Sequence, residues 1–370
     1  MARLGTRSPP WDRFAHWAPG AAILALALIL VTLAGAAITD RSDIPPVPAT
    51  TIGGQAVPAQ TGIDDADLKL YERVAERVAA GENYYVAAVA EHRAAAFPLY
   101  PPLTVRLPTL AWISAMLGEN GLLVAAGALW IALLAGWWWR LSEEPGGGRH
   151  IVIALLLLFT GTVAGLKPQY LALHEVWSGA LLALALALHR TGEKSGHWIG
   201  AWIAAALALS IRELALPFVL LMGVMAMLRR DWREAGAWAL LVAMFAVGLL
   251  AHVNAVDALT GAADGASAGW LALRGLAGWT GNIVLTSPLW LLPGMIAAPL
   301  ALLPLIGWAG WKSKAGLTGF LFFLGYGVMF MIAGRADNFY WGLMIVPAYF
   351  LGLVHMPRAL GSLWNSAQGH

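Results

Sequence analysis

The sequence predicts an all-α, polytopic integral membrane protein with about 10 to 11 transmembrane helices and interfacial helices in its first long outer loop. Of its 370 residues, 59% are hydrophobic and only 12% are charged, whereas soluble domains carry about 25% charged residues. The 19 Trp and 41 Gly residues also suit a bilayer protein, because Trp anchors at membrane interfaces and Gly is common in spanning helices. Apolar runs recur along the whole chain. Together these observations exclude a soluble protein.

Composition also excludes several kinds of chemistry. The chain has no cysteine, so disulfides, thiolate catalysis and cysteine-ligated metals are ruled out. The net charge is +2, and no basic patch with interleaved aromatic residues is present. Nucleic acid is therefore not an expected partner.

The first apolar run, 21–38, follows Arg3, Arg7 and Arg13. Its sequence AGAAIT has the small residues of a signal-peptidase site, but the run is longer than the roughly 7–15 residues of a cleaved signal. We therefore expect a retained first span. Its basic flank predicts a cytoplasmic N-terminus.

Each expected span is close to the roughly 20 residues that a bilayer core requires. The expected spans are 20–38, 102–118, 120–139, 150–166, 171–189, 197–229, 237–256, 288–309, 316–333 and 339–356. The run 197–229 is too long for one straight crossing. It is either a tilted or broken single span or a helical hairpin that turns at 210–213.

Basic linkers predict the sidedness of the loops. Linkers 229–234 and 311–314 are basic, which indicates the cytoplasmic side. Loop 257–288 then lies outside, on the same side as loop 39–101. Two loops on the same side must be separated by an even number of spans. This favours a single crossing by 197–229. The prediction is one domain, 1–370, with ten spans and both termini inside; eleven spans are the alternative.

The first outer loop, 39–101, begins with a proline-rich piece and continues as two expected interfacial helices, near 64–80 and 83–95. Apolar side chains at helical spacing would lie on the membrane; they are Leu68, Tyr71, Val74 and Val78. Charged side chains would face water; they are Asp67, Lys69, Arg73 and Arg77.

The second outer loop, 257–288, contains the segment 269–282. Trp270 and Trp279 flank a short apolar helix there. Because Trp favours the membrane interface, we expect this helix also to lie in the interface.

Three carboxylates, Asp64, Asp65 and Asp67, stand directly ahead of the amphipathic run. A carboxylate can act as a general base, and neighbouring carboxylates raise its pKa towards a useful range. The structural alternative is an N-cap near Ala66, which explains one or two of the three. Oxygen ligands also suit Mg²⁺ or Mn²⁺, so a divalent cation held by Asp64 and Asp65 stays open as a cofactor.

Arg106 lies about one turn into an apolar segment that starts with two prolines, Pro101 and Pro102. A cation at that depth needs a partner. The guanidinium suits a lipid-linked phosphate because of its fork of donors. The alternative is an arginine that extends to the lipid headgroups.

Ionisable residues within apolar runs usually mark function. Lys167, His174 and Glu175 lie around the junction of two expected spans, and Arg212 and Glu213 interrupt the run 197–229. Adjacent helical residues point about 100° apart, so Arg212 and Glu213 need not pair with each other. Glu213 is instead expected to pair with Arg106 or Lys167. Substrate binding and a structural polar network both remain open for this group.

The last candidate group is a polar turn followed by an aromatic helix start, expected on the outer side. Arg335, Asp337 and Tyr340 are its candidate substrate-binding residues. Arg335 would bind a phosphate, and Tyr340 with Trp341 would stack on a sugar. The alternative is an Asn338 cap with an aromatic belt.

At these residues the chain resembles the GT-C superfamily of membrane glycosyltransferases. The resemblance rests on the acidic motif 64–67, the two helices of 64–95, and the Pro-Pro-Leu start at 101–103. Asp67-Leu68-x-x-Tyr71, followed by Gly81-x-x-Tyr84-Tyr85, is similar to the pattern of polyprenyl-phosphate-mannose-dependent mannosyltransferases.

This resemblance implies transfer of a sugar from a polyprenyl-phosphate donor to a glycan, lipid or protein acceptor on the outer face of a bacterial inner membrane. It implies an inverting, single-displacement reaction with Asp67 as the base and Arg106 at the leaving phosphate, helped by Lys167 or Arg335. The main alternative is a transporter or flippase of a lipid-linked or small polar substrate. An O-antigen ligase or polymerase fits less well, because those proteins concentrate function in a late loop. An intramembrane protease fits least, because its motifs are missing.

Overall fold

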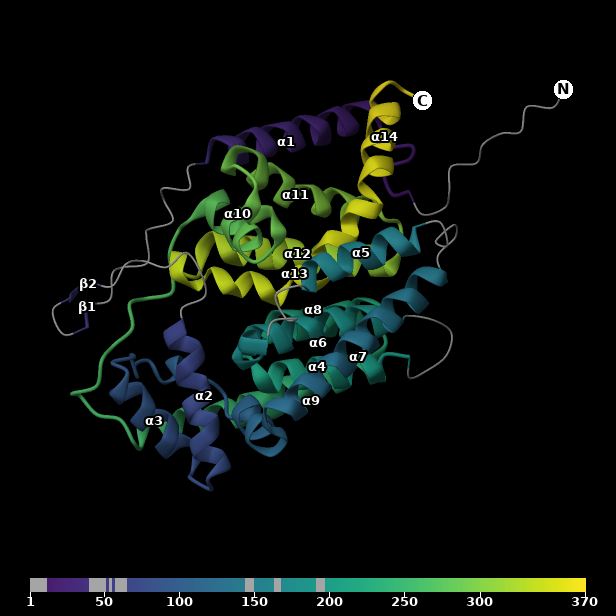
Figure 1. Cartoon of the computed structure of the whole chain (residues 1–370). Coiled ribbons are helices and arrows are strands. Elements are labelled where there is room, and N and C mark those ends of the chain that lie inside the picture. The colour runs from purple at the N-terminus through teal and green to yellow at the C-terminus, as the bar shows by residue number, and fades with distance from the viewer. Residues whose placement is uncertain are drawn as a thin grey trace.

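The computed structural model describes residues 12–39, 65–143, 150–162, 168–190 and 197–370, and the backbone of two short strands. The side chain of Asp65 lies outside this description. The strands β1 (Thr51–Ile52) and β2 (Gln55–Ala56) pair antiparallel. The α-helices are α1 (Pro19–Ile38), α2 (Asp65–Ala79), α3 (Tyr84–Ala94), α4 (Thr109–Ser142), α5 (Ile151–Thr162), α6 (His174–Leu188), α7 (Ile199–Ile211), α8 (Leu216–Leu228), α9 (Trp232–Asp257), α10 (Gly275–Leu285), α11 (Gly294–Gly310), α12 (Lys314–Ile332), α13 (Val346–Tyr349) and α14 (Met356–Ala367) (Figure 1). The 3-10 helices are η2 (Pro102–Thr104), η5 (Pro168–Ala172), η6 (Glu213–Ala215), η7 (Pro288–Leu291), η8 (Ala336–Met344) and η9 (Phe350–Val354).

This helical architecture is consistent with a helical membrane protein. Four of the described helical segments are long and apolar enough to cross a bilayer; they are Pro19–Ile38, Pro102–Ser142, Trp232–Asp257 and Lys314–Ile332. Shorter apolar helices of 10–17 residues accompany them. The predicted all-helical class is therefore confirmed in its coarse form.

Local sequence signals explain several helix starts. The Asn83 side chain accepts hydrogen bonds from the Tyr85 and Val86 amides at 2.9 and 3.4 Å, and so caps α3. Asp231 caps α9 through the Glu234 amide at 3.1 Å, and Ser313 caps α12. Such side chains satisfy amides that a helix start leaves without a partner.

The bundle has two ends, which several contacts define. At the terminal end, the Arg13 amide donates to the Gly310 carbonyl at 2.9 Å, and the Ser366 hydroxyl donates to the Phe14 carbonyl at 3.0 Å. At the loop end, the Leu99 amide donates to the Gly265 carbonyl at 2.9 Å. Figure 1 shows α2 and α3 at the loop end, far from the C-terminus.

The run 197–229 forms a helical hairpin. Near the start of α7, the Trp202 indole donates to Ala237 of α9 at 2.9 Å, and just after α8, Arg229 pairs with Glu234 of α9 at 2.8 Å. Both outer ends of the run therefore meet the start of α9. Between them, Arg212 has an extended backbone, with φ −143° and ψ 120°, and reverses the chain. The single crossing favoured by loop parity is wrong, and the hairpin is the arrangement present.

Residues 102–139 divide where expected. The two expected spans, 102–118 and 120–139, meet at a kink at Gly118, with φ 64° and ψ −179°, which divides α4 into two arms. The first arm begins only at Thr109, after η2. The Thr109 hydroxyl contacts the Ser210 carbonyl at the loop end, and Arg140 contacts the His189 carbonyl at the far end of α6. The first arm of α4, from Thr109 to the break at Gly118, lies against α2 and is shorter than the roughly 20 residues that a crossing needs.

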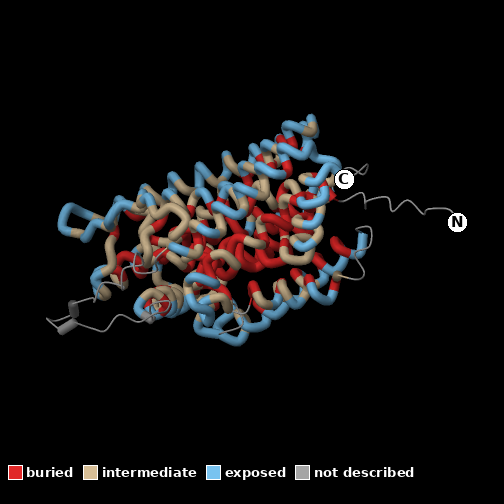
Figure 2. Tube along the Cα trace, turned by 90° about the horizontal axis from the view of Figure 1, so that it is seen from above, coloured by how far each residue is buried: buried red, intermediate tan, exposed pale blue. Residues whose placement is uncertain are grey.

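Burial follows the interior of the bundle. Figure 2 shows buried residues along its middle and exposed residues around its outside. Many exposed side chains are large and apolar, such as Leu24, Val31 and Val247, which are 71%, 70% and 69% exposed. An apolar exterior of this kind fits a lipid environment.

Gly179 allows α6 to lie directly against η8, which carries Tyr340. A Cβ at this position would sit 2.0 Å from the Leu343 carbonyl oxygen. We expect Gly179→Ala to destabilise the protein by about 1–3 kcal/mol, because backbone must move to relieve the overlap. Thermal unfolding in detergent measures this. Gly127→Ala, in α4 with nothing within 4 Å of the added Cβ, is the matched control; equal melting temperatures for the two variants would contradict the packing argument.

Candidate functional site

The helices α2 and α3 form one wall of the site. Their bounds agree with the expected helices 64–80 and 83–95. The expectation that the apolar face of α2 lies on the membrane is wrong, since Leu68 and Val74 are each only 4% exposed. This face packs on α3, on the first arm of α4 and on η5, which sequence periodicity alone could not reveal.

Ion pairs hold α2 and α3 together. Arg73 pairs with Glu91 at 2.7 Å, and Arg77 pairs with Glu82 at 2.6 Å and with Glu91 at 2.9 Å. The hydrogen bond from Arg73, followed by that from Arg77, lowers the pKa of Glu91 against the opposing effect of burial. Arg73 and Arg77 of α2 are therefore ion-paired with acids of the same loop.

The two predicted outer loops meet at the loop end. Arg93 of α3 pairs with Asp264 at 2.7 Å, and the Ser267 amide donates to the Tyr100 carbonyl at 2.7 Å. The hydrogen bond from Arg93, with one from the Gly261 amide, lowers the pKa of Asp264 to about 2. The two loops therefore lie at the same end of the bundle, and their position on the outer face stays a prediction.

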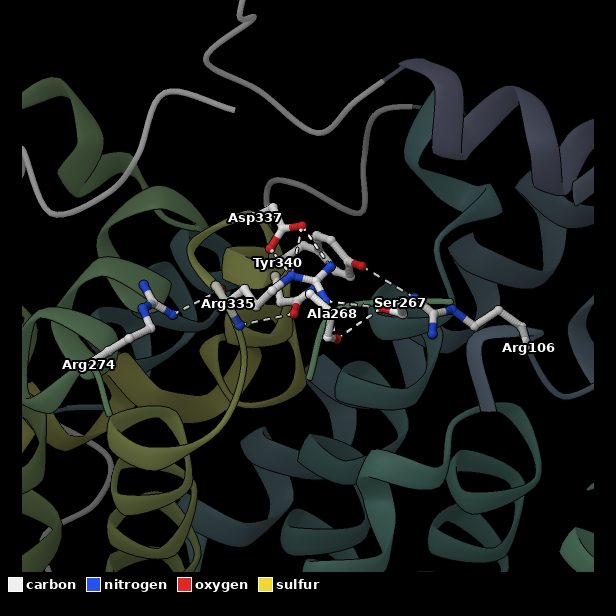
Figure 3. A network of polar contacts seen from close by, with 8 residues as sticks. Arg106, Ser267, Ala268, Arg274, Arg335, Asp337 and Tyr340 are labelled. Carbon is white, nitrogen blue, oxygen red and sulfur yellow. Dashed lines mark hydrogen bonds and ion pairs between the residues drawn. The ribbon is translucent and has the colours of Figure 1, made fainter. Parts of the chain in front are cut away.

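Arg106 lies between three tyrosines. Its Nε donates to the Tyr71 hydroxyl at 3.0 Å and its Nη2 to the Tyr340 hydroxyl at 3.3 Å, while the Tyr84 hydroxyl donates to the Arg106 carbonyl at 2.6 Å. Figure 3 shows Arg106 and Tyr340 extending towards each other from opposite sides. Within the described residues Arg106 makes no ion pair with a carboxylate. Two of the five N–H groups of the guanidinium thus contact phenols.

Tyr71 connects Arg106 to the acidic end of α2. Burial raises the pKa of the Tyr71 phenol, Arg106 opposes this, and the negative charge of Asp67 adds to it. Asp67 and Tyr71 are four residues apart on α2 and so share a face. The Tyr71 ring also packs edge-on against the His174 ring, with centroids 5.0 Å apart. The pattern Asp67-Leu68-x-x-Tyr71 includes this tyrosine, but helical spacing predicts it on the apolar face of the helix.

The structure describes only part of the acidic cluster 64–67. Asp67 is half-buried on α2. Asp64 and the side chain of Asp65 lie outside the described residues. In the part of the chain that the structure describes, no three His, Asp or Glu side chains are grouped to hold a metal ion. The Mg²⁺ or Mn²⁺ prediction at Asp64 and Asp65 stays a prediction.

The charges predicted within apolar runs form a compact group around buried Arg212. Arg212 pairs with Glu175 at 2.7 Å, their side chains being 2% and 1% exposed, and it also contacts Glu213. The expectation that Glu213 pairs with Arg106 or Lys167 is not met within the described chain, and Lys167 lies outside it. The expectation assumed a continuous helix, but the backbone of Arg212 is extended. Its side chain therefore reaches both Glu175 and Glu213.

Arg335 is held by Asp337 and by the second loop. It pairs with Asp337 at 2.9 Å and donates to the Ser267 hydroxyl and the Ala268 carbonyl at 3.1 and 3.0 Å. Figure 3 shows this group beside Tyr340. Arg335 and Asp337 therefore connect the second loop to η8, and Tyr340 connects η8 to Arg106.

The second loop does not contain the expected interfacial helix over 269–282. Its helix is α10, Gly275–Leu285, and it packs on α12 and η8. Trp279 is 6% exposed and Asn282 is fully buried. Trp279 packs against Gly327 of α12 rather than at a membrane interface.

A cavity of about 710 Å³ opens beside Arg106. Its walls come from α2, α3, the first arm of α4 and the segment 168–174. Tyr71, Arg106 and His174 line it, and so do three exposed carboxylates, Glu72, Glu76 and Glu119. Sequence reasoning missed these carboxylates. Their only sequence signal is the four-residue spacing of Glu72 and Glu76, which places both on one side of α2.

Comparison with protein-family models, with curated proteins and with solved structures finds no match to this chain.

Proposed function

We propose that this protein is a membrane glycosyltransferase that moves a sugar from a polyprenyl-phosphate donor to an acceptor hydroxyl at the loop end. The observation that carries the proposal is Arg106. It is a half-buried cation held by phenol hydroxyls, with no carboxylate in ion-pair contact among the described residues. Burial keeps the Tyr71 phenol protonated at neutral pH. The positive charge of Arg106 is therefore held in place for an anionic ligand, as a phosphate site requires.

The proposed reaction is a single displacement with inversion. Asp67 takes the proton of the acceptor hydroxyl as its oxygen bonds to the anomeric carbon. The bond from that carbon to the phosphate oxygen breaks, and its electron pair goes to the lipid phosphate. Arg106 stabilises the charge that develops there, which a fixed cation away from bulk water does effectively. Arg106 donates a hydrogen bond to Tyr71, and the negative charge of Asp67 acts on the same phenol. This proximity supports their acting on one substrate.

We infer ten crossings with both termini in the cytoplasm. They are α1, the second arm of α4, α5 to α9, α11, α12, and the segment from η8 to η9. The linkers after α8 and α11 are basic and lie at the terminal end, which favours a cytoplasmic position for that end. The loop end then faces outwards, and a bacterial inner membrane fits a polyprenyl-phosphate donor. The acceptor is a glycan, lipid or protein.

Arg106→Ala is expected to weaken binding of polyprenyl phosphate by about ten- to a hundredfold, since a charge-assisted hydrogen bond contributes about 1.5–3 kcal/mol. Native mass spectrometry of the purified protein with undecaprenyl phosphate measures the affinity. Lys69→Ala removes an exposed cation of α2 and is expected to have little effect. Failure of the wild type to bind the lipid phosphate would refute the proposal.

A transporter or flippase is the second candidate. The hairpin α7–α8 breaks at Arg212, and Glu175 and Glu213 contact that arginine at the break. Interrupted helices of this kind surround substrate sites in transporters. Movement of a fluorescent polyprenyl-phosphate sugar between leaflets of proteoliposomes, without sugar transfer, would favour this candidate.

A further inference from the structure

The cavity beside Arg106 is unevenly charged. Its inner lining includes one guanidinium, that of Arg106, and its exposed side carries the carboxylates of Glu72, Glu76 and Glu119. None of these three carboxylates makes an ion pair within the described ranges. Burial, followed by the negative charges of Glu76 and Glu119, raises the pKa of Glu72. Glu72 is thus close enough to Glu76 and to Glu119 to be repelled by both.

The cations of α2 only partly balance this negative charge. Lys69 and Arg73 lower the pKa of Glu72, but burial and the charges of Glu76 and Glu119 raise it more. Arg73 and Arg77 make their ion pairs with Glu91 and Glu82. Two acids of the helix therefore line the cavity without an ion pair in the described chain, while Arg73 and Arg77 form their ion pairs outside it. An anionic ligand group placed among these carboxylates would be repelled, whereas hydroxyl groups could donate hydrogen bonds to them.

His174 supplies an independent sign of a ligand. It lines the cavity, it is only 4% exposed, and its Nδ1 atom has no hydrogen-bond partner in the described part of the chain. Buried polar atoms are nearly always satisfied, so an unpaired one in a side chain that lines a cavity indicates a missing partner. A sugar hydroxyl both donates and accepts, and so serves either tautomer of the ring.

The size and lining of the cavity agree with a small polar ligand. Its volume of about 710 Å³ falls within the roughly 300–1,000 Å³ of small-molecule sites. Small side chains, Ala75, Ala111, Ser114 and Ala115, form much of the wall and leave room between the polar groups.

We propose that this cavity binds a non-anionic sugar residue, with one hydroxyl at His174 Nδ1 and others at the carboxylates of Glu72, Glu76 and Glu119. The assignment of the ligand as a sugar rests on the proposed function. It deepens that function by assigning charge selectivity: the transferred or accepting sugar is neutral or carries an amine, and uronic acids are rejected.

Saturation-transfer NMR with the full-length protein in nanodiscs tests this at constant ionic strength. The probes are methyl mannoside, methyl glucosaminide and methyl glucuronide. The neutral and the cationic glycosides are expected to bind, and the glucuronide to bind at least about tenfold more weakly. Equal affinity for the mannoside and the glucuronide, or no binding of any glycoside, would overturn the proposal.

Two sets of variants locate the binding. In Glu72→Gln/Glu76→Gln/Glu119→Gln the preference against the glucuronide should shrink to within about threefold, because the repelling charges are gone. Asp257→Asn with Glu143→Gln removes exposed carboxylates outside the cavity and should leave the preference unchanged. If the triple variant does not fold, Glu72→Gln alone should lower the preference against the glucuronide by a smaller amount. An unchanged preference in both cavity variants would contradict the proposed site.

His174→Ala should weaken all bound glycosides by about five- to tenfold, the value of one hydrogen bond. His174→Asn places a donor and an acceptor near the same position and should restore part of the affinity; no loss in the alanine variant would contradict the role of His174.

Charge-selective glycoside binding without lipid-phosphate binding would leave this inference standing and refute the proposed donor. The reverse result would refute the cavity assignment alone.

Discussion

Replacing Asp67 with asparagine is expected to lower sugar transfer by about 10²–10⁴-fold, because asparagine cannot accept the proton of the acceptor hydroxyl. The protein should still insert and fold, since Asp67 is half-buried at the edge of the bundle and the change preserves shape. The measurement is turnover with polyprenyl-phosphate sugar donors, alongside size-exclusion profile and melting temperature.

Two comparisons make this result specific to Asp67. Asp257→Asn changes an exposed carboxylate at the C-terminal end of α9, outside the cavity lining, and should retain full turnover. Lipid-phosphate binding should survive Asp67→Asn but fall in Arg106→Ala, which separates the base from the phosphate ligand. Turnover near that of the wild type in Asp67→Asn would move the base to Asp64 or Asp65, or remove this mechanism.

Arg212→Met is expected to destabilise the protein by about 3–5 kcal/mol, because it leaves buried carboxylates without a cation. Glu175 is 1% exposed, and its only ion pair in the described chain is with Arg212. Glu213 would lose the same contact. Reversible unfolding in mixed micelles, or the melting temperature where unfolding is irreversible, measures the effect.

Matched variants separate charge burial from loss of an arginine side chain. Arg73→Met breaks a pair whose side chains are 41% and 14% exposed, and should cost less than about 1 kcal/mol. Arg212→Met combined with Glu175→Gln and Glu213→Gln should recover much of the stability, because no buried charge is then left unpaired. An Arg212→Met protein as stable as the wild type would show that the ion pair does not stabilise the hairpin.

Sequence reasoning succeeded where the signal is local. The helix at 65–79 and the helix at 84–94 follow from periodicity and from the Asn83 cap. Arg106 was identified because a cation in an apolar segment is rare, and the structure places it with Tyr71 and Tyr340, both members of the predicted groups.

Sequence reasoning failed where a single residue decides the direction of the chain. The run 197–229 reads as one apolar segment, and only the extended backbone of Arg212 makes it a hairpin. The residues 102–139 read as two spans, and the division at Gly118 is correct, but the arm before it is too short to cross a bilayer. Neither turn contains a proline at its centre, and hydropathy does not register a change of direction.

The sequence by itself determined an all-helical class consistent with a membrane protein, an acidic segment after the first apolar helix, and isolated charges in apolar surroundings, because composition and periodicity depend on neighbouring residues alone. Only the tertiary structure decided which charges meet. It joined Arg212 to Glu175, joined Arg106 to Tyr71 and Tyr340, and assembled the cavity from four separate segments. Those contacts depend on how the helices pack and where they turn, and residues far apart in the chain carry no mark of that in one sequence.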